Sequence, residues 1–478
     1  MSTPWVRAIF WIYLLFLIWA SATVTNPVDP DLWHRLAVGE YLWQHGHFPA
    51  GDTFSYLSDY KEVADHEWGC AVIFYALWQW GGGGAIVATK LATLAVTLAL
   101  VVWAGIHNRR PVAWMAAFYA LVLLAMLPAF QSTVRCMVFT QVLFALWVFW
   151  FQRERRGHPV PTLAYVATMI LWANLHGGFV IGLVWLLAVT VVRAICGDAW
   201  KKEAVRLGVC ALATLVNPFG WRLWISTGRA LVANRHGFDE WASVSWFSSP
   251  LLYPGYKLLL LGVLVALGVQ LYRRPWRYLD HAGLILLGAF AALSLVAARH
   301  TSLFAVVAGA LLPGFVGDDW DFVRGNHPLR RLGVMGLSAA PALIPFYTAL
   351  VVLPGAGLSL EYPPIAAPVA AVDYLKRENI RGNLLVPFNY GSYALWELRG
   401  RMRVSMDGRY DLVYRPETYW RVDDFFAARG KDWQGLLTNP APDAILVPMS
   451  DAACSKLKND SAWNEAYHDD TDAVFLPR

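Results

Sequence analysis

Long apolar runs recur along most of the chain, and short polar segments separate them. A helix needs about 20 apolar residues to cross a bilayer, and we expect the shorter runs to extend into their flanking polar turns. The pattern predicts eleven membrane-spanning helices, at residues 9–24, 85–106, 112–130, 137–151, 162–174, 179–196, 205–216, 256–272, 282–298, 303–316 and 332–353.

The remaining segments have other patterns. Residues 25–68 form a long loop between the first two long runs, and Gly81–Gly84 is expected to end a short helix at 68–80. After residue 353 the apolar positions alternate between helical and strand-like spacing, which predicts a small α/β domain over 354–478. Its helices are predicted at 369–378, 417–428 and 451–458, and its strands at 383–387, 403–406, 444–447 and 473–476.

Composition agrees with a chain embedded in a membrane. Hydrophobic residues make up 57% of the 478 residues and charged residues 15%, whereas soluble domains carry about 25% charged residues. This composition excludes a disordered chain, a coiled coil and an ordinary cytosolic enzyme. The five cysteines show neither the spacing of metal ligands nor the pattern of paired disulfides. We also expect no nucleic-acid partner.

The positions of Lys and Arg predict the topology. With the N-terminus inside, the short inner loops are strongly basic, as in Arg109-Arg110 and Arg153–Arg156, while the longer outer segments hold fewer basic residues. This positive-inside pattern places residues 25–68 and the last 125 residues outside. Ala20-Ser21-Ala22 offers an alternative, signal-peptide cleavage, and the chain emerges on the outer side in either case.

Asp29 and Asp31 in the first outer segment form a D-x-D pair. Such carboxylates can hold a divalent cation against a phosphate, or one of them can deprotonate an attacking hydroxyl. The alternative is that an Asp caps the helix expected at 32–43. This helix is apolar on more than one side, which predicts a position at the membrane surface, where a lipid-linked substrate would arrive.

Asp65-His66-Glu67-Trp68 closes the same segment. Polar residues followed by Trp commonly anchor a chain at the membrane–water interface. The alternative is that His66 and Glu67 belong to a catalytic site. The spacing is not H-E-x-x-H, so no zinc site is predicted.

Other outer turns also carry ionisable or amide side chains. A single Arg or His at the end of a span usually extends its charge to the membrane interface or caps the helix. For Glu240 the alternative to a binding role is a place in a solvated loop. For Asp407-Gly408-Arg409 the alternative is a tight turn without a function. If several such turns converge, their cations beside carboxylates suit an anionic phosphate. The predicted substrate-binding set is His34, Arg135, Asn174, His176, Glu240, Arg299, His300, Asp407 and Arg409.

Six stretches in this order resemble GT-C glycosyltransferases, specifically the protein O-mannosyltransferase and aminoarabinose-transferase branch. They are DPDLWHRLAVGEYLWQHGHFPAGDTFSY, DHEW, NLHGG, NPFG, ARH and NYGSYALWELRGRMRVSMDGRYDL. The resemblance implies a mainly α, polytopic GT-C-like bundle over 1–353, with its catalytic loop at 25–68, and a periplasmic α/β domain over 354–478. It also implies a multi-pass protein of the bacterial inner membrane with a cytoplasmic N-terminus.

The resemblance also implies roles for these residues. Asp31 would be the catalytic base and Asp29 the second candidate, with His66 and Glu67 positioning the acceptor or the phosphate. Arg299, His300 and Arg135 would stabilise the departing phosphate. Mg²⁺ or Mn²⁺ could be held by Asp29, Asp31 or Glu240, although the branch need not use a metal.

The expected function is therefore transfer of a sugar from a polyprenyl-phosphate-linked donor to an acceptor on the outer face. The expected partners are the donor, the acceptor and the lipid bilayer. The acceptor is left open between a lipid, a glycan and a protein. A non-catalytic lipid-glycan binding or assembly protein is the alternative, favoured by departures such as Leu32 after Asp31, where that branch has Glu. A transporter is a further alternative, disfavoured because charges are scarce in the middle of the spans.

Overall fold

The computed structural model describes residues 4–23, 28–60, 63–106, 112–130, 134–232, 241–246, 252–273, 280–315, 360–362, 367–430 and 433–478. The chain divides into two compact units. The helical unit comprises residues 1–26, 87–217 and 235–359. The mixed unit comprises residues 27–86, 218–234 and 360–478.

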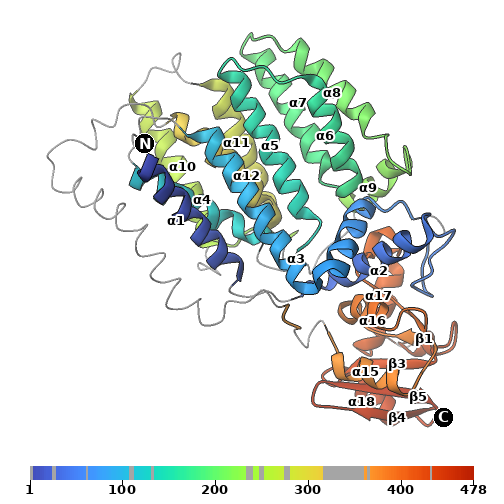
Figure 1. Cartoon of the computed structure of the whole chain (residues 1–478). Coiled ribbons are helices and arrows are strands. Elements are labelled where there is room, and N and C mark those ends of the chain that lie inside the picture. The colour runs from blue at the N-terminus through green and yellow to red at the C-terminus, as the bar shows by residue number, and fades with distance from the viewer. Residues whose placement is uncertain are drawn as a thin grey trace. The chain divides into compact units, whose positions relative to one another are not determined.

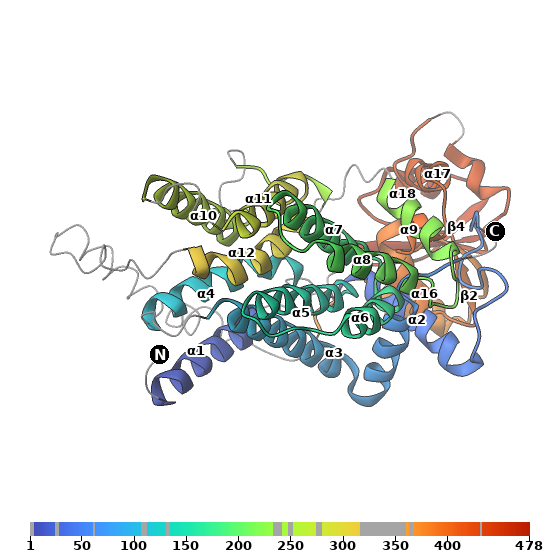
Figure 2. The same ribbon diagram turned by 90° about the horizontal axis from the view of Figure 1, so that it is seen from above.

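The helical unit is a bundle in which α12 is the most deeply buried helix (Figures 1 and 2). Every residue of α12 except Gly314 is buried, because α4, α5, α10 and α11 all pack against it. The described helices are α1 (Pro4–Thr23), the later part of α3 (Trp68–Gly105), α4 (Val112–Met126), η1 (Leu127–Ala129), α5 (Met137–Arg155), α6 (Thr162–Leu175), α7 (Phe179–Ile195), α8 (Lys201–Ala213), α10 (Pro254–Arg273), α11 (His281–Val296), η4 (Ala298–His300) and α12 (Thr301–Phe315).

The helices coincide with most of the predicted spans. Ten of the eleven apolar runs fall on described helices, and the run at 332–353 lies outside the described residues. By length and composition alone, two described helices are long and apolar enough to cross a bilayer, Trp68–Gly105 and Pro254–Tyr272. Shorter apolar helices of 10–17 residues are Ala8–Trp19, Trp114–Met126, Thr162–Leu175, Phe179–Ile195 and His281–Val296. The number of eleven spans therefore stays a prediction.

Helix α3 changes direction at the glycine run. Gly81 and Gly82 have non-helical backbone angles inside the otherwise continuous helix, and the φ of Gly82 is +54°. A positive φ is readily accessible only to glycine. The predicted interruption after residue 80 is thus confirmed.

The mixed unit is built on a five-stranded sheet with the order β2-β1-β3-β5-β4. Strand β1 pairs in parallel with β2 and β3, whereas β5 pairs antiparallel with β3 and β4. The strands are β1 (Gly382–Leu385), β2 (Met402–Val404), β3 (Ala444–Pro448), β4 (Trp463–His468) and β5 (Asp472–Pro477). The helices are α2 (Pro30–His45), the start of α3, α9 (Arg222–Val232), α15 (Val369–Arg377), α16 (Phe388–Glu397), η6 (Tyr410–Leu412), α17 (Pro416–Phe426), η7 (Trp433–Leu437) and α18 (Ala452–Lys458).

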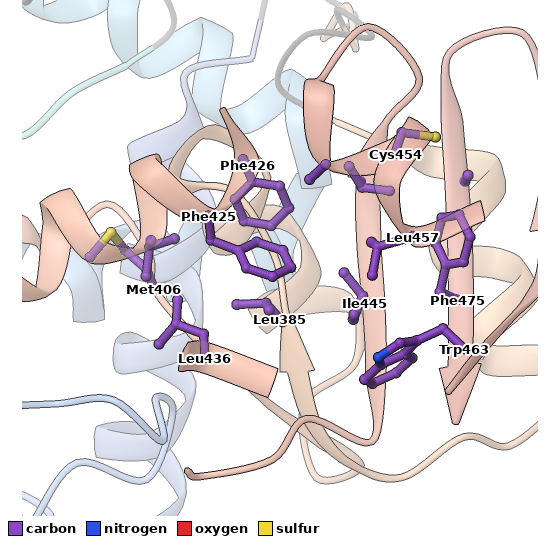
Figure 3. Close-up of a cluster of buried hydrophobic side chains, with 14 of the residues drawn as sticks. Leu385, Met406, Phe425, Phe426, Leu436, Ile445, Cys454, Leu457, Trp463 and Phe475 are labelled. Atoms are coloured by element: carbon purple, nitrogen blue, oxygen red, sulfur yellow. The ribbon is translucent and has the colours of Figure 1, made fainter. Parts of the chain in front are cut away.

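One face of this sheet carries an apolar core (Figure 3). Leu385 of β1, Ile445 of β3 and Phe475 of β5 point toward the same layer as Phe425 of α17 and Leu457 of α18. Alternate residues of a strand face opposite sides of a sheet, so this face needs only every second residue to be apolar. The mixture of helices and strands predicted for 354–478 is confirmed in its described residues, 360–362, 367–430 and 433–478.

The first outer segment belongs to the same unit as the C-terminal residues. Ser55 pairs with Val404 beside the edge strand β2, and the N–H of Tyr56 donates to the carbonyl of Val404 at 3.1 Å. Helix α2 also packs against α16. The compact units therefore divide the chain differently from the boundary expected at 353/354, because these pairings join segments about 350 residues apart in sequence.

Candidate functional site

The start of α2 separates the roles of the two aspartates in D-x-D. Asp29 is the N-cap residue: its Oδ1 accepts the backbone N–H of Asp31 at 2.9 Å, and Pro30 follows at the first helical position. Both features are favoured at a helix start. The capping alternative therefore applies to Asp29, which is buried, whereas Asp31 lies in the first turn with a half-exposed side chain.

Asp31 lies beside a turn of the C-terminal region. Its Oδ1 is 4.0 Å from His34 Nδ1, one turn further along α2. A Cβ atom on Gly408 would lie 2.5 Å from Asp31 Oδ1 and 2.9 Å from His34 Nδ1, so only glycine fits there without displacing both side chains. The Oγ of Ser392 accepts the N–H of Gly408 at 2.9 Å and lies 3.2 Å from His34 Nδ1. Ser392 thus connects the turn to the histidine.

His34 is a neutral side chain in this arrangement. Burial, followed by the charge of Arg35, lowers the pKa of His34 well below its ordinary value. Its Nε2 is buried and has no hydrogen-bond partner among the described residues. His34 can therefore hydrogen-bond at neutral pH, but it supplies no positive charge for a phosphate.

Arg35 connects α2 to the end of the first outer segment. Its Nη1 donates to Asp65 Oδ2 at 2.6 Å, and its Nη2 lies 2.8 Å from Glu67 Oε2. His66 Nε2 is 3.9 Å from the other oxygen of Glu67. The predicted roles of His66 and Glu67 stay predictions, and the structure adds that Glu67 is ion-paired. Sequence reasoning missed Arg35, although an arginine in an apolar helix is itself a sign of a buried partner.

A second ion cluster surrounds Arg409. Its guanidinium donates to both carboxylate oxygens of Asp52, at 2.9 Å each, and to both oxygens of Asp407, at 2.8 and 2.6 Å. Tyr414 donates its hydroxyl to Asp407 Oδ2 at 2.9 Å. Two-pronged contacts of this kind fix geometry as well as charge. Arg409 therefore ties the first outer segment to the turn that carries Gly408.

The electrostatics of this cluster follow from its burial. Burial alone would raise the pKa of Asp407, but the charge and hydrogen bonds of Arg409 lower it to about 2. Burial would likewise lower the pKa of Arg409, yet Asp407 and Asp52 raise it well above its ordinary value. Asp407 and Arg409 were predicted to bind substrate. Their charges are directed at each other and at Asp52, which is the geometry of residues that hold the turn.

In the helical unit, a neutral network surrounds His176. Its Nδ1 accepts the backbone N–H of Gly178 at 2.9 Å and lies 2.8 Å from Thr140 Oγ1, which accepts the indole N–H of Trp172 at 2.8 Å. An Nδ1 that accepts from a backbone N–H carries no proton, so these contacts assign the neutral form with its proton on Nε2. A Cβ on Gly178 would collide with Thr140 and His176, which explains the glycine in NLHGG.

The start of α5 connects this turn to the A-R-H turn. Thr140 contacts His176, and its neighbour Gln141 donates to Ser302 Oγ at 2.8 Å, two residues after His300. The carbonyl of Arg135 accepts the N–H of Val138 at the same helix start. The helical unit thus brings together three of the turns that were predicted to bind substrate.

The remaining predicted residues take up individual positions. Asn174 donates to the carbonyls of Ile170 and Val216, each at 2.8 Å. The guanidinium of Arg299 lies 4.0 Å from the ring centre of Trp241, and His300 Nδ1 is 3.2 Å from the carbonyl oxygen of Leu293. Glu240 lies outside the described residues.

The expected metal stays a prediction, because Glu240, one of its three expected ligands, lies outside the described residues. Among the described residues, no group of three or more His, Cys, Asp or Glu side chains has the geometry to hold an ion. Asp29 Oδ1 already accepts the N–H of Asp31. No chemical step is therefore derived through Mg²⁺ or Mn²⁺.

Solved structures with the same fold are known. ArnT from Cupriavidus metallidurans bound to undecaprenyl phosphate matches with a TM-score of 0.53 and 15% identity, over 99% of this chain and 98% of that one. Apo ArnT from the same organism matches with a TM-score of 0.56 and 16% identity, over the same shares. The arabinofuranosyltransferase AftD from Mycobacteria matches with a TM-score of 0.56 and 13% identity, over 100% of this chain and 40% of that one.

The chain has the GT-C fold. The resemblance predicted from its sequence is confirmed at this level. No protein-family model and no curated protein sequence matches the chain.

Proposed function

We propose that this chain is a membrane glycosyltransferase that moves a sugar from a polyprenyl-phosphate-linked donor to an acceptor hydroxyl. The GT-C fold supports the reaction class, and the undecaprenyl phosphate bound to ArnT supports the class of donor. The apolar helices support a location in a membrane. The orientation expected from the basic loops puts the reaction on the outer face of a bacterial inner membrane.

One observation carries the assignment of the base: Asp31 is the accessible carboxylate of its cluster. Its side chain is 45% exposed, compared with 7% for Asp65, 1% for Asp52 and none for Asp407. The three buried carboxylates are engaged by Arg35 or Arg409. A general base must reach the proton that it removes, so exposure favours Asp31.

The proposed step is an inverting displacement. The acceptor hydroxyl loses its proton to Asp31, its oxygen forms a bond to the anomeric carbon, and the bond between that carbon and the phosphate oxygen breaks. Polyprenyl phosphate leaves with the electron pair. A departing phosphate is stabilised by hydrogen-bond donors or cations. The sequence resemblance gives this role to Arg299, His300 and Arg135, and His176 adds an Nε2–H as a further candidate donor in the same helical unit. His34, whose Nδ1 lies 4.0 Å from Asp31 Oδ1, is neutral and adds no charge beside the base.

The experiment uses membranes that contain the full chain and radiolabelled polyprenyl-phosphate-linked sugars. We expect Asp31→Asn to lower turnover by about 100-fold or more, the usual contribution of a general base. Asp29→Asn should keep turnover within about fivefold, because Asn caps a helix as well as Asp does. Glu40→Gln is a matched control, since Glu40 lies on the same helix and pairs with Arg399 away from Asp31.

If a folded Asp31→Asn variant has wild-type turnover, Asp31 is not the catalytic base. Binding of polyprenyl phosphate without transfer from any hexosyl or pentosyl donor would instead favour the non-catalytic alternative.

A further inference from the structure

The mixed unit contains a pocket of about 550 Å³ that is separate from Asp31 and its neighbours. It opens where β1 and β3 end, between Pro387, which precedes α16, and Pro448, the last residue of β3. Ligands of α/β sheets bind outside the carboxyl ends of parallel strands, and β1 and β3 are a parallel pair. The volume lies within the range of small-molecule sites.

Aromatic and sulfur-containing side chains form much of the wall. Phe388 of α16 and Tyr419 of α17 line the pocket, with ring centres 5.5 Å apart and planes nearly perpendicular. Met406 and Phe426 belong both to this wall and to the apolar core behind it (Figure 3). The pocket therefore has a packed back wall, which favours a preformed site.

The polar part of the wall is acidic. Asp423, Asp451 and Asp470 line the pocket, and none of the lining residues that the structure describes is Lys, Arg or His. Burial raises the pKa of Asp451, and the charges of Asp423 and Asp472 raise it further. Arg429 pairs with Asp423 but is not among the lining residues. A ligand with a negative charge would meet repulsion here, whereas hydroxyl and amine donors would find acceptors.

We propose that this pocket binds a sugar ring that carries no negative charge. The carboxylates would accept hydrogen bonds from its hydroxyls or from an amine. The rings of Phe388 and Tyr419 would cover its C–H surface, and Asn389 and Ser450 offer further donors and acceptors. The inference deepens the proposed function, on which it rests for the choice of a sugar, by giving the mixed unit a second glycan site.

The test uses the purified full chain in detergent micelles and three matched probes: methyl glucoside, methyl glucosaminide and methyl glucuronide. All three share the glucose ring, and each charged probe differs from the neutral glucoside in one group: a cationic amine at C2 in the glucosaminide and an anionic carboxylate at C6 in the glucuronide. Saturation-transfer NMR titrations measure each Kd. We expect the glucoside and the glucosaminide to bind and the glucuronide to bind about tenfold more weakly or not at all.

Three variants locate the binding. Asp451→Asn keeps the shape of the pocket but removes a charged acceptor, and it should weaken glucoside binding about tenfold. Asp373→Asn removes an exposed carboxylate of α15 in the same unit and should leave Kd unchanged. Asp31→Asn should also leave Kd unchanged, which separates this site from the proposed catalytic one.

Absence of binding by all three probes would overturn the inference, as would equal Kd values for all three. A Kd that responds to Asp31→Asn and not to Asp451→Asn would place the sugar elsewhere. Each of these results leaves the transfer assay untouched, so failure of this site and failure of the proposed transferase function are told apart.

Discussion

Two clusters, one around α2 in the mixed unit and one around the NLHGG turn in the helical unit, hold their polar residues in different ways. Around α2 the residues are charged: Arg35 and Arg409 lie in buried ion pairs with carboxylates. Around the NLHGG turn they are neutral: Thr140, His176 and Trp172 share hydrogen bonds and carry no charge in the form that these bonds assign.

The difference matters because the two networks respond differently to the loss of one member. Removing one partner of a buried ion pair leaves an uncompensated charge, which is strongly destabilising. Removing one member of a neutral network costs a hydrogen bond and the desolvation of its partner. The ion pairs therefore hold the fold around Asp31, whereas the neutral network orients a single ring.

The largest effect is expected for Arg409→Met. The variant leaves Asp52 and Asp407 buried without their shared cation, and we expect a loss of about 3 to 5 kcal/mol in the free energy of unfolding. Thermal unfolding of the purified protein, followed by tryptophan fluorescence, measures the loss.

Arg429→Met is the matched control for this variant. Arg429 also pairs with two aspartates, Asp423 and Asp424, but at the surface, where such pairs contribute less than about 1 kcal/mol. Similar losses in both variants would show that burial of the Arg409 cluster adds nothing.

Acid should weaken the same cluster in wild-type protein. The pKa of Asp407 is about 2 in the folded chain, below the value of about 4 expected when unfolded. Its stabilisation, about 2 to 3 kcal/mol, is thus present above pH 4 and lost as the pH falls through 2. The stability difference between wild type and Asp407→Asn, measured by denaturant unfolding, should shrink over that window. A difference that stays constant from pH 7 to pH 2 would contradict this account.

Much of the fold could be predicted from the sequence, because buried apolar residues recur at the spacing of a helix or a strand. The apolar runs mark the helices, and the predicted strands at 383–387 and 444–447 fall on β1 and β3. Helix α16 was not predicted, since its sequence FNYGSYALWE begins with turn-forming residues. Its packing depends on the tertiary fold: a Cβ on Gly391 would collide with the carbonyl of Met406. Strand β4 was not predicted, because it is a polar edge strand that is half exposed along most of its length.

The candidate site could be predicted only in part, for a related reason. Asp31 and the Asp-Gly-Arg turn have local signatures in the sequence. Ser392 and Asp52 have none, because their partners His34 and Arg409 lie 358 and 357 residues away. The capping role of Asp29 was open in the sequence, since either aspartate could begin the helix.

Gly408→Ala tests the site without disturbing the ion pairs. The added Cβ would displace Asp31 and His34, and we expect turnover in the transfer assay to fall about tenfold. The unfolding temperature should fall less than in Arg409→Met, because the buried ring of His34 must shift but no buried charge loses its partner. Gly51→Ala is the control: it lies in the first outer segment, and a Cβ there meets nothing within 4 Å. Equal turnover in both variants would remove Gly408 from the site.

The smallest effect concerns the neutral network. Thr140→Val removes the hydroxyl that contacts His176 and accepts from Trp172, and we expect turnover to fall about fivefold, the equivalent of one hydrogen bond of about 1 kcal/mol. The helical unit supplies its own control, because Thr168 accepts the indole N–H of Trp147 at 2.9 Å. Thr168→Val removes the same kind of bond without a histidine.

The two threonine variants separate a structural role from a functional one. Both lose a tryptophan–threonine hydrogen bond, so both should lose about the same stability in thermal unfolding. Only Thr140→Val frees the ring of His176, so only that variant should change turnover. In addition, ¹⁵N chemical shifts of labelled histidine should show the Nε2–H form in wild type and a mixture in Thr140→Val. If the two variants lose turnover equally, the neutral network supports helix packing alone. The charged and the neutral clusters would then differ only in how much each stabilises the fold.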